Sequence, residues 1–448
     1  ITCRDWSSDV CSSDLELFGP QAEAWRLDSG AWSLGDDSLA ERLADIFIAY
    51  TAAGWELALE ASPSGVRERV PLGPALALSG EALSERVLEV WVSWEGIPLL
   101  KAQIEAWAAR AGIKAKVLEV PSIKSKLMAV VRGGGKAPDL VMLQSDYLAD
   151  LRDAGALQEL DGLVLPLTME KGRDAFTLEA RSYAAPFYCD SQLVFYNKSL
   201  VPEAPRQGWT LADMERMAMA SGVRAPAAWN AFSAYWFLPF VAGFGAHPFA
   251  GGSGDPDFSH PGWREAMAWL KGASERGFLA ALERDAMMAY FCSGKTAFML
   301  SGSYSIPELE RLGVPFGVAP FPRTSPGGSF LAPMLDYKGF GIPRTSRNPL
   351  AARRLAQHLS NPAVQARFCA PLGKLPANVE AWSLSSGTSP YLPALRNSFD
   401  LGMPVPAHAA YGNLKNALWK LLRLYLDGSM SAEETIQSAR QISEKRDQ

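Results

Sequence analysis

An aspartate stands at the entrance of an apolar stretch near the middle of the chain. Asp190 lies within PFYCDSQLVFYNKSL, from Pro186 to Leu200, and precedes residues typical of a buried strand. A buried carboxylate is costly unless it is paired, so this side chain must have a partner, lie open in a cleft, or meet a ligand. A carboxylate accepts strong hydrogen bonds from hydroxyl groups, which makes Asp190 a candidate binding residue.

Two more candidate positions follow strand patterns in the first half of the chain. Trp94 and Glu95 come at the end of VLEVWVSW, and Asp146 follows the wholly apolar DLVML. Open α/β sheets bind ligands beyond the carboxyl ends of their strands, which predicts that these residues share one region. For Asp146 a second interpretation stays open, because it could cap a helix that begins at Tyr147.

Composition excludes several classes of function. The five Cys and four His are scattered, with no CxxC spacing, so the sequence predicts neither a disulfide framework nor a metal site, and no cofactor. A net charge of −5 argues against nucleic acid as the main partner. The longest apolar run, from Ala234 to Gly245, is too short to span a bilayer and is interrupted by Pro239.

The order of elements predicts an α/β fold from Val87 onward. Strand patterns such as IKAKVLEV alternate with helical patterns such as GIPLLKAQIEAWAARAG, as in an open α/β sheet. Thr210 with Asp213 predicts a helix start of the capping-box type.

The residues before Val87 differ in character. Residues 16–84 show short alternating apolar runs between turn residues, which predicts a small β-rich segment. This segment weakly resembles the β-sandwich tail of α-amylase-family glycosidases, and it could be the end of a domain fused upstream. The chain begins at Ile1, and DWSSDVCSSDL resembles the translation of a sequencing adapter. We therefore interpret residues 1–15 as an artefact that hides any signal sequence.

Seven segments in one order carry a family resemblance that runs from about Val87 to the C-terminus. They are VLEVWVSW, GGGKAPDLVMLQSDYLADLRDAGAL, AAPFYCDSQLVFYNKSLV, GWTLADM, YFCSGKTAFMLSGSY, RNPLAARRLAQHLSNPAVQARF and GKLPAN. This series resembles the extracellular solute-binding proteins of the carbohydrate family, most closely the maltose/maltodextrin-binding proteins of ABC importers.

The resemblance implies a two-lobed, type II periplasmic-binding-protein-like α/β fold with three hinge crossings. Lobe 1 would hold residues 87–188 and 318–371, and lobe 2 residues 193–317 and 372–448. The crossings would fall near Cys189–Gln192, Phe316–Phe321 and Cys369–Leu372. Asp190 would then lie at the cleft floor, its burial offset by ligand hydroxyls or water, or alternatively by backbone N–H groups.

Matching the family's sugar contacts to this sequence gives a set of acids and aromatic rings. Trp94 and Glu95 stand where the family has an acid and a base, and Asp146 and Asp190 keep acidic positions. A family Trp falls near Lys415, where Tyr411 one turn earlier could replace it. Each ring could instead pack in the core. The implied ligand-binding residues are Trp94, Glu95, Asp146, Asp190, Tyr235, Trp236, Tyr304 and Tyr411.

The resemblance implies a binding protein that does no chemistry. It would be a monomeric, periplasmic or otherwise extracytoplasmic receptor that presents a neutral oligosaccharide, with malto-oligosaccharide favoured, to ABC permease subunits in the membrane. Two alternatives stay open. The lobes could be the accessory part of a truncated α-glucan hydrolase, or the acids and rings could form a cage for a cation such as a polyamine.

Overall fold

The structure, a computed structural model, describes residues 23–27, 43–51, 54–61, 66–71, 87–160, 163, 168–249, 256–385 and 389–444. The predicted adapter stretch, residues 1–15, lies outside these ranges. The chain forms two compact units, which we describe separately. The first holds the described residues up to Val90, with residues 101–118 and 348–355, and the second holds the others.

The first unit contains a four-stranded antiparallel sheet in the segment predicted to be β-rich. Its strands follow the chain in the order β1-β2-β3-β4. They are β1 (Glu23–Leu27), β2 (Leu43–Thr51), β3 (Gly54–Ala61) and β4 (Val66–Pro71). The unit also takes in most of α4 (Ile97–Arg110) and β6 (Lys114–Glu119), and the first part of α13 (Pro349–Leu359).

The second unit is built on a mixed sheet with the strand order β12-β11-β13-β10-β15-β7. β14 and β16 also pair with β10, β17 pairs with β15, and β5 (Val87–Val92) ends in this unit. The strands are β7 (Leu140–Gln144), β10 (Ala184–Asn197), β11 (Ala227–Trp229), β12 (Leu279–Ala281), β13 (Phe298–Gly302), β14 (Phe316–Ala319), β15 (Met334–Gly341), β16 (Leu375–Pro376) and β17 (Met403–Pro404).

Strand β10 connects two groups of elements within this unit. All fourteen of its residues are buried. Residues 184–191 pair with β15, whereas residues 192–196 pair with β13 and residues 194–197 with β14. The strand thus changes partners between Ser191 and Gln192, within the predicted first crossing.

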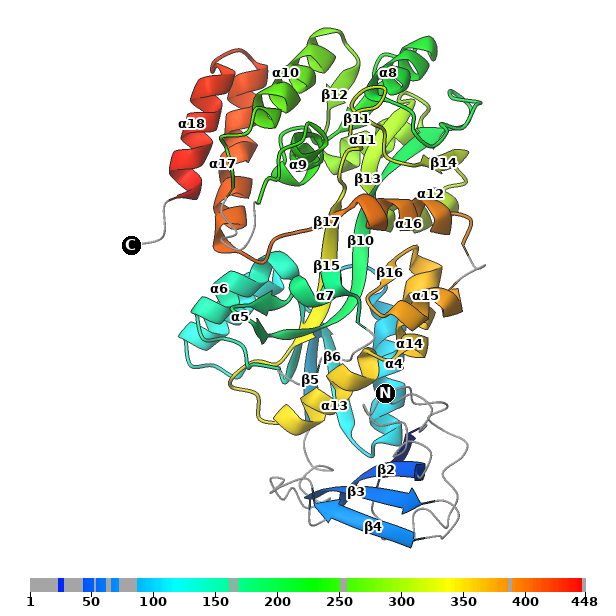
Figure 1. Ribbon diagram of the computed structural model, residues 1–448, viewed down its shortest axis with the longest axis vertical. Coiled ribbons are helices and arrows are strands. Elements are labelled where there is room, and N and C mark those ends of the chain that lie inside the picture. Colours follow the sequence, from blue (N-terminus) through cyan, green and yellow to red (C-terminus); the bar gives the residue numbers. More distant parts are fainter. Residues whose placement is uncertain are drawn as a thin grey trace. The chain divides into compact units, whose positions relative to one another are not determined.

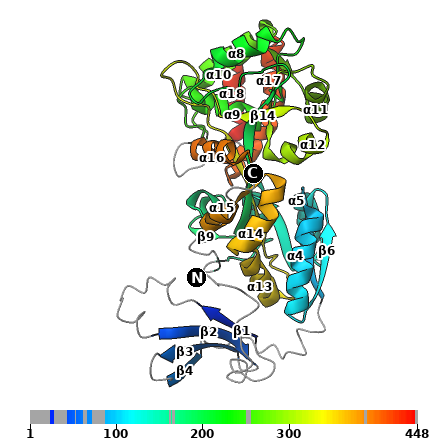
Figure 2. The same cartoon turned by 90° about the vertical axis from the view of Figure 1, so that its right-hand side faces the viewer.

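Helices surround the two ends of β10 and β15, as both views show (Figure 1, Figure 2). One group consists of α5 (Ile123–Arg132), α6 (Leu148–Asp153), α7 (Glu170–Asp174), α14 (Pro362–Cys369) and α15 (Val379–Ser385). The other consists of α8 (Leu211–Ala220), α9 (Ala234–Gly243), α10 (Gly262–Glu275), α11 (Arg284–Cys292), α12 (Ile306–Arg311), α16 (Leu392–Leu401), α17 (Ala409–Leu426) and α18 (Ala432–Ser443).

Strand pairing shows which elements meet the two ends of β10 later in the chain. β14 pairs with residues 194–197 of β10, and β15 pairs with residues 184–191. β16 pairs with Tyr188 and Cys189. The predicted crossings near Phe316–Phe321 and Cys369–Leu372, and the lobe boundaries that depend on them, stay predictions.

Local sequence signals set the helix starts. The predicted capping box at Thr210 is confirmed: its hydroxyl accepts from the Asp213 N–H at 3.1 Å, and the Asp213 carboxylate accepts from the Thr210 N–H at 3.0 Å. Ser431 and Glu434 form a second capping box at the start of α18. Each reciprocal pair satisfies two N–H groups that a helix start otherwise leaves unpaired.

Candidate functional site

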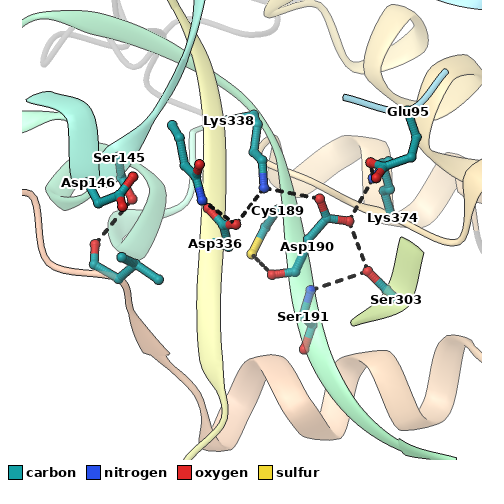
Figure 3. Close-up of polar contacts among 12 residues, drawn as sticks. Glu95, Ser145, Asp146, Cys189, Asp190, Ser191, Ser303, Asp336, Lys338 and Lys374 are labelled. Carbon is teal, nitrogen blue, oxygen red and sulfur yellow. Dashed lines mark hydrogen bonds and ion pairs between the residues drawn. The ribbon is translucent and has the colours of Figure 1, made fainter. Parts of the chain in front are cut away.

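Asp190 is paired with two buried lysines at the point where β10 changes partners (Figure 3). Its Oδ1 accepts from Lys374 Nζ at 2.7 Å and from the Ser303 hydroxyl at 3.1 Å, and its Oδ2 accepts from Lys338 Nζ at 3.2 Å. The Asp190 side chain is 2% exposed, and the lysine side chains are 0% and 3% exposed. This aspartate is therefore the centre of a buried ion-pair cluster.

The groups that compensate the burial of Asp190 differ from those that the sequence predicted. The sequence predicted ligand hydroxyls, cleft water or backbone N–H groups, whereas the structure supplies two ammonium groups. Burial alone would raise the pKa of Asp190, but Lys374 and Lys338 outweigh it and hold the pKa below its usual value. Asp190 is therefore ionised at neutral pH.

Lys338 joins Asp190 to a second buried acid, Asp336. Lys338 Nζ donates to Asp336 Oδ2 at 2.6 Å, and Gln144 Nε2 donates to the same oxygen at 2.7 Å. Burial would lower the pKa of Lys338, but Asp336 and Asp190 raise it. Burial raises the pKa of Asp336, which Lys338 opposes and Asp146 reinforces. The other oxygen of Asp336, Oδ1, is buried without a hydrogen-bond partner.

Lys374 extends the cluster toward Glu95. Its Nζ lies 3.1 Å from Glu95 Oε2 and 4.6 Å from the centre of the Tyr188 ring. Glu95 is 46% exposed, so its carboxylate can also meet a ligand. The Glu95 loop approaches Leu372 at Gly96, where a Cβ would lie 2.4 Å from the Leu372 side chain. The φ of Gly96 is +77°, a left-handed value that favours glycine.

Trp94 adopts a strained backbone conformation beside the cluster. Its φ is +69°, a left-handed value that is rare for a bulky side chain. Its half-buried ring lies 5.5 Å from Lys338 Nζ and 6.2 Å from the Tyr147 ring. Burial and the acids Asp146 and Asp336 raise the pKa of Tyr147 to about 12. Such strain is concentrated at functional sites, where neighbouring contacts hold it in place.

Asp146 is ion-paired rather than a helix cap. α6 begins at Leu148 and receives no side-chain capping bond, whereas Asp146 Oδ2 lies 3.0 Å from Lys415 Nζ on α17. Its Oδ1 is buried without a hydrogen-bond partner. The capping interpretation is therefore wrong, and Lys415 pairs with the acid from the position that the family resemblance assigned to an aromatic ring.

Tyr235 and Tyr304 reach the same region from the other end of β10. Gln192 links strand and helix, because its Nε2 donates to the Tyr235 carbonyl at 2.5 Å and its Oε1 accepts from the Met334 N–H at 2.8 Å. Tyr304 follows Ser303, the partner of Asp190. The Tyr304 ring lies over Gly302, where a Cβ would come within 2.1 Å of it. Both tyrosines are half-buried.

Two other aromatic candidates are core residues in this conformation. Tyr411 is 1% exposed and packs edge-on against Phe249 at 5.7 Å, so its ring has no free face. Trp236 is 8% exposed and meets the Tyr235 ring edge-on at 5.0 Å. Both fit the core-packing alternative, and neither enters the proposed ligand surface below.

The sequence reasoning missed the cations of the site. One signal was available, because Asp336 and Lys338 are two residues apart in an otherwise apolar strand and so lie on one face of it. Lys374 was also present in the GKLPAN segment, but nothing local indicated its partner. The site residues that were not predicted are Tyr147, Ser303, Asp336, Lys338 and Lys374.

The described part of the chain offers neither a metal centre nor a membrane helix. No group of three or more His, Cys, Asp or Glu side chains among these residues could hold a metal ion. None of the described helices combines the length and the apolar character that crossing a membrane requires.

Comparison with known proteins gives consistent matches over most of the chain. A family model described as bacterial extracellular solute-binding protein matches residues 102–386. A maltodextrin-binding protein of Bacillus subtilis is 26% identical over 269 residues, which cover 55% of this chain and 62% of the relative. A maltooligosaccharide ABC transporter solute-binding lipoprotein of Streptococcus pneumoniae is 26% identical over 329 residues, covering 67% and 75%. The chain thus spans less than two thirds of the first relative.

The fold matches solved structures as well. The Thermus thermophilus maltotriose binding protein, bound with maltotriose, superposes with a TM-score of 0.68 at 23% identity. The superposition covers 79% of this chain and 99% of that one. This likeness confirms the predicted two-lobed, type II α/β fold.

Proposed function

Because this chain belongs to the bacterial extracellular solute-binding proteins, we propose that it is the substrate-binding receptor of an ABC-type sugar importer. Its ligand is a neutral oligosaccharide, with malto-oligosaccharide favoured. The relatives named for maltodextrin and maltooligosaccharide support this choice, as does the similar structure that holds maltotriose.

One observation carries the proposal: carboxylates and half-buried rings gather around the strand that joins the two groups of elements. Glu95 is exposed beside Lys374, and Trp94 lies against Lys338. Tyr304 follows the serine that holds Asp190. Rings can cover the apolar face of a pyranose while carboxylates accept from its hydroxyl groups. The proposed ligand surface consists of Trp94, Glu95, Tyr235 and Tyr304, with Asp146 and Asp190 beneath it.

In this proposal Asp190 does not contact the sugar but holds the neighbouring lysines in place. Its two oxygens are already engaged by Lys374, Ser303 and Lys338, so it holds the lysines and contributes negative charge. Closure of the lobes on the sugar completes binding, and the closed form is what the permease subunits meet. The protein acts outside the cytoplasmic membrane as a monomer and catalyses no reaction.

A cationic ligand such as a polyamine is the second candidate, and a specific observation favours it. Asp336 Oδ1 and Asp146 Oδ1 are buried acceptors without hydrogen-bond partners. Around them the acids Glu95, Asp146, Asp190 and Asp336 face the cations Lys338, Lys374 and Lys415. One negative charge is therefore in excess, and an ammonium group would balance it.

Thermal unfolding with added ligand separates the two candidates. We expect maltotriose to stabilise the protein, by about 2.7 kcal/mol when its free concentration is 100 times Kd, because it binds only the folded state. Spermidine at the same concentration should leave the melting temperature unchanged. The reverse result would favour the cationic ligand, and no shift with either would count against both.

Tyr304 gives a sharper test of the sugar surface. We expect Tyr304→Ala to weaken maltotriose binding about 30-fold or more, since truncating a central aromatic contact costs about 2 kcal/mol or more. Tyr304→Phe keeps the ring and should stay within about threefold. Titration calorimetry on both variants decides the point, and equal losses would show that the hydroxyl rather than the ring is needed.

A further inference from the structure

A pocket separate from the Asp190 cluster lies between α16 and the end of β10 with β14. Its volume is about 700 Å³, within the range of about 300–1,000 Å³ that small-molecule sites occupy. One wall comes from Tyr196, Lys198 and Gly317, and the other from Tyr391 and residues 392–394, 396, 397 and 400 of α16. None of the residues that line it takes part in the ion pairs of Asp190.

Two tyrosines line this pocket, Tyr391 with a half-buried side chain and Tyr196 with one that is only 7% exposed. Tyr391 stacks on Phe316 with the ring centres 5.2 Å apart and the planes 14° apart, which fixes its orientation. The Tyr196 ring lies against Gly317, where a Cβ would come within 2.3 Å of it. A residue larger than glycine at position 317 would displace the Tyr196 ring.

The polar groups of the pocket include an acceptor that nothing in the protein satisfies. Asn397 Oδ1 is buried and has no hydrogen-bond partner. Lys198, Arg396 and Asp400 also line the pocket. Buried amide oxygens are normally paired, so the Asn397 oxygen would accept from a bound molecule if its side chain turned toward the pocket.

We propose that this pocket is a second saccharide-binding site, for a small neutral sugar. The half-buried Tyr391 ring suits the apolar face of a pyranose, and the Asn397 amide with Lys198 and Arg396 suits its hydroxyl groups. The mixed charge of Lys198, Arg396 and Asp400 favours a neutral ligand over an anion.

Helix α16, which lines the pocket, is also hydrogen-bonded to β10, the strand that changes partners. The same helix that carries Asn397 places Ser398 on β10, where its hydroxyl donates to the Gln192 carbonyl at 2.7 Å. A sugar in the pocket would touch both α16 and β14, and would therefore contact two elements that pack on β10.

The test is calorimetric titration of the full chain with maltose and maltotriose. We expect two classes of site, one tight and one at least tenfold weaker. Asn397→Leu, which keeps the size of the side chain, and Tyr391→Ala should each weaken the second class at least tenfold and leave the first unchanged. Tyr304→Ala should weaken the first class and leave the second unchanged. Arg216→Ala, an exposed change on α8, is the matched control and should alter neither class.

The possible outcomes test the second site and the proposed function separately. Binding in the unchanged protein that consists of the tight class alone would overturn the second site, as would a weak class that survives both Asn397→Leu and Tyr391→Ala. Loss of the weak class in these variants, with the tight class absent throughout, would support the pocket and reject the proposed function. Far-ultraviolet circular dichroism and a melting curve for each variant show that it is folded.

Discussion

Replacing Asp190 with alanine should lower the free energy of unfolding by about 3–5 kcal/mol, the usual cost of removing one partner from a buried ion pair. The change leaves two ammonium groups, Lys338 and Lys374, buried without their shared carboxylate. Denaturant unfolding at neutral pH measures the loss. Because both oxygens of Asp190 already accept hydrogen bonds from the protein, we expect the effect on stability to exceed the effect on sugar affinity.

A matched change at the surface serves as the control. Asp285 is also paired with a cation, Arg284, but its side chain is 94% exposed, so Asp285→Ala should change stability by less than about 0.5 kcal/mol. The pKa of Asp190 is lowered on folding, so its contribution exists above its usual value of 3.8 and is lost as pH falls through the folded-state value. Equal losses for Asp190→Ala and Asp285→Ala would contradict the buried ion-pair cluster.

The sequence predicted well those features that depend on neighbouring residues. The alternation of strands and helices, the capping box at Thr210 and the polar residues after the strands are local patterns, and the structure contains all of them. Asp190 was singled out because an acid beside an apolar run is conspicuous, but it was predicted to precede the buried strand, whereas it lies inside β10, which already begins at Ala184. Local periodicity is enough for such predictions.

The partners of Asp190 could not be predicted in that way. Lys338 and Lys374 are 148 and 184 residues away along the chain, and only the sheet topology brings them to the same carboxylate. A lysine in a turn or on a strand has the same local pattern whether it is solvated or buried. The same limit applies to Tyr411, since its position on α17 is compatible with a cleft and with the core until the packing against Phe249 is known.

A second large loss of stability is expected when Lys338 is replaced by methionine. Lys338→Met keeps the length of the side chain but removes the charge that lies between Asp190 and Asp336, at 3.2 and 2.6 Å. At pH 7.5 we expect a loss of about 3–5 kcal/mol in the free energy of unfolding, because two buried carboxylates then repel each other. Lys101→Met is the control, since that lysine is half exposed in a surface pair with Glu105.

The pH dependence of the stability of Lys338→Met shows whether Lys338 stabilises the fold through its charge or through the packing of its hydrocarbon chain. Burial raises the pKa of Asp336, and Lys338 opposes the rise, so removing the lysine must move that pKa further above its usual value of 3.8. The folded variant then takes up a proton at a pH where the unfolded chain does not, and its stability relative to the unmodified protein must recover as the pH falls from 7.5 through the folded-state pKa of Asp336. A loss that is the same at every pH would instead mean that Lys338 stabilises the fold through its hydrocarbon chain alone, and the acids of the site would not be held together by charge.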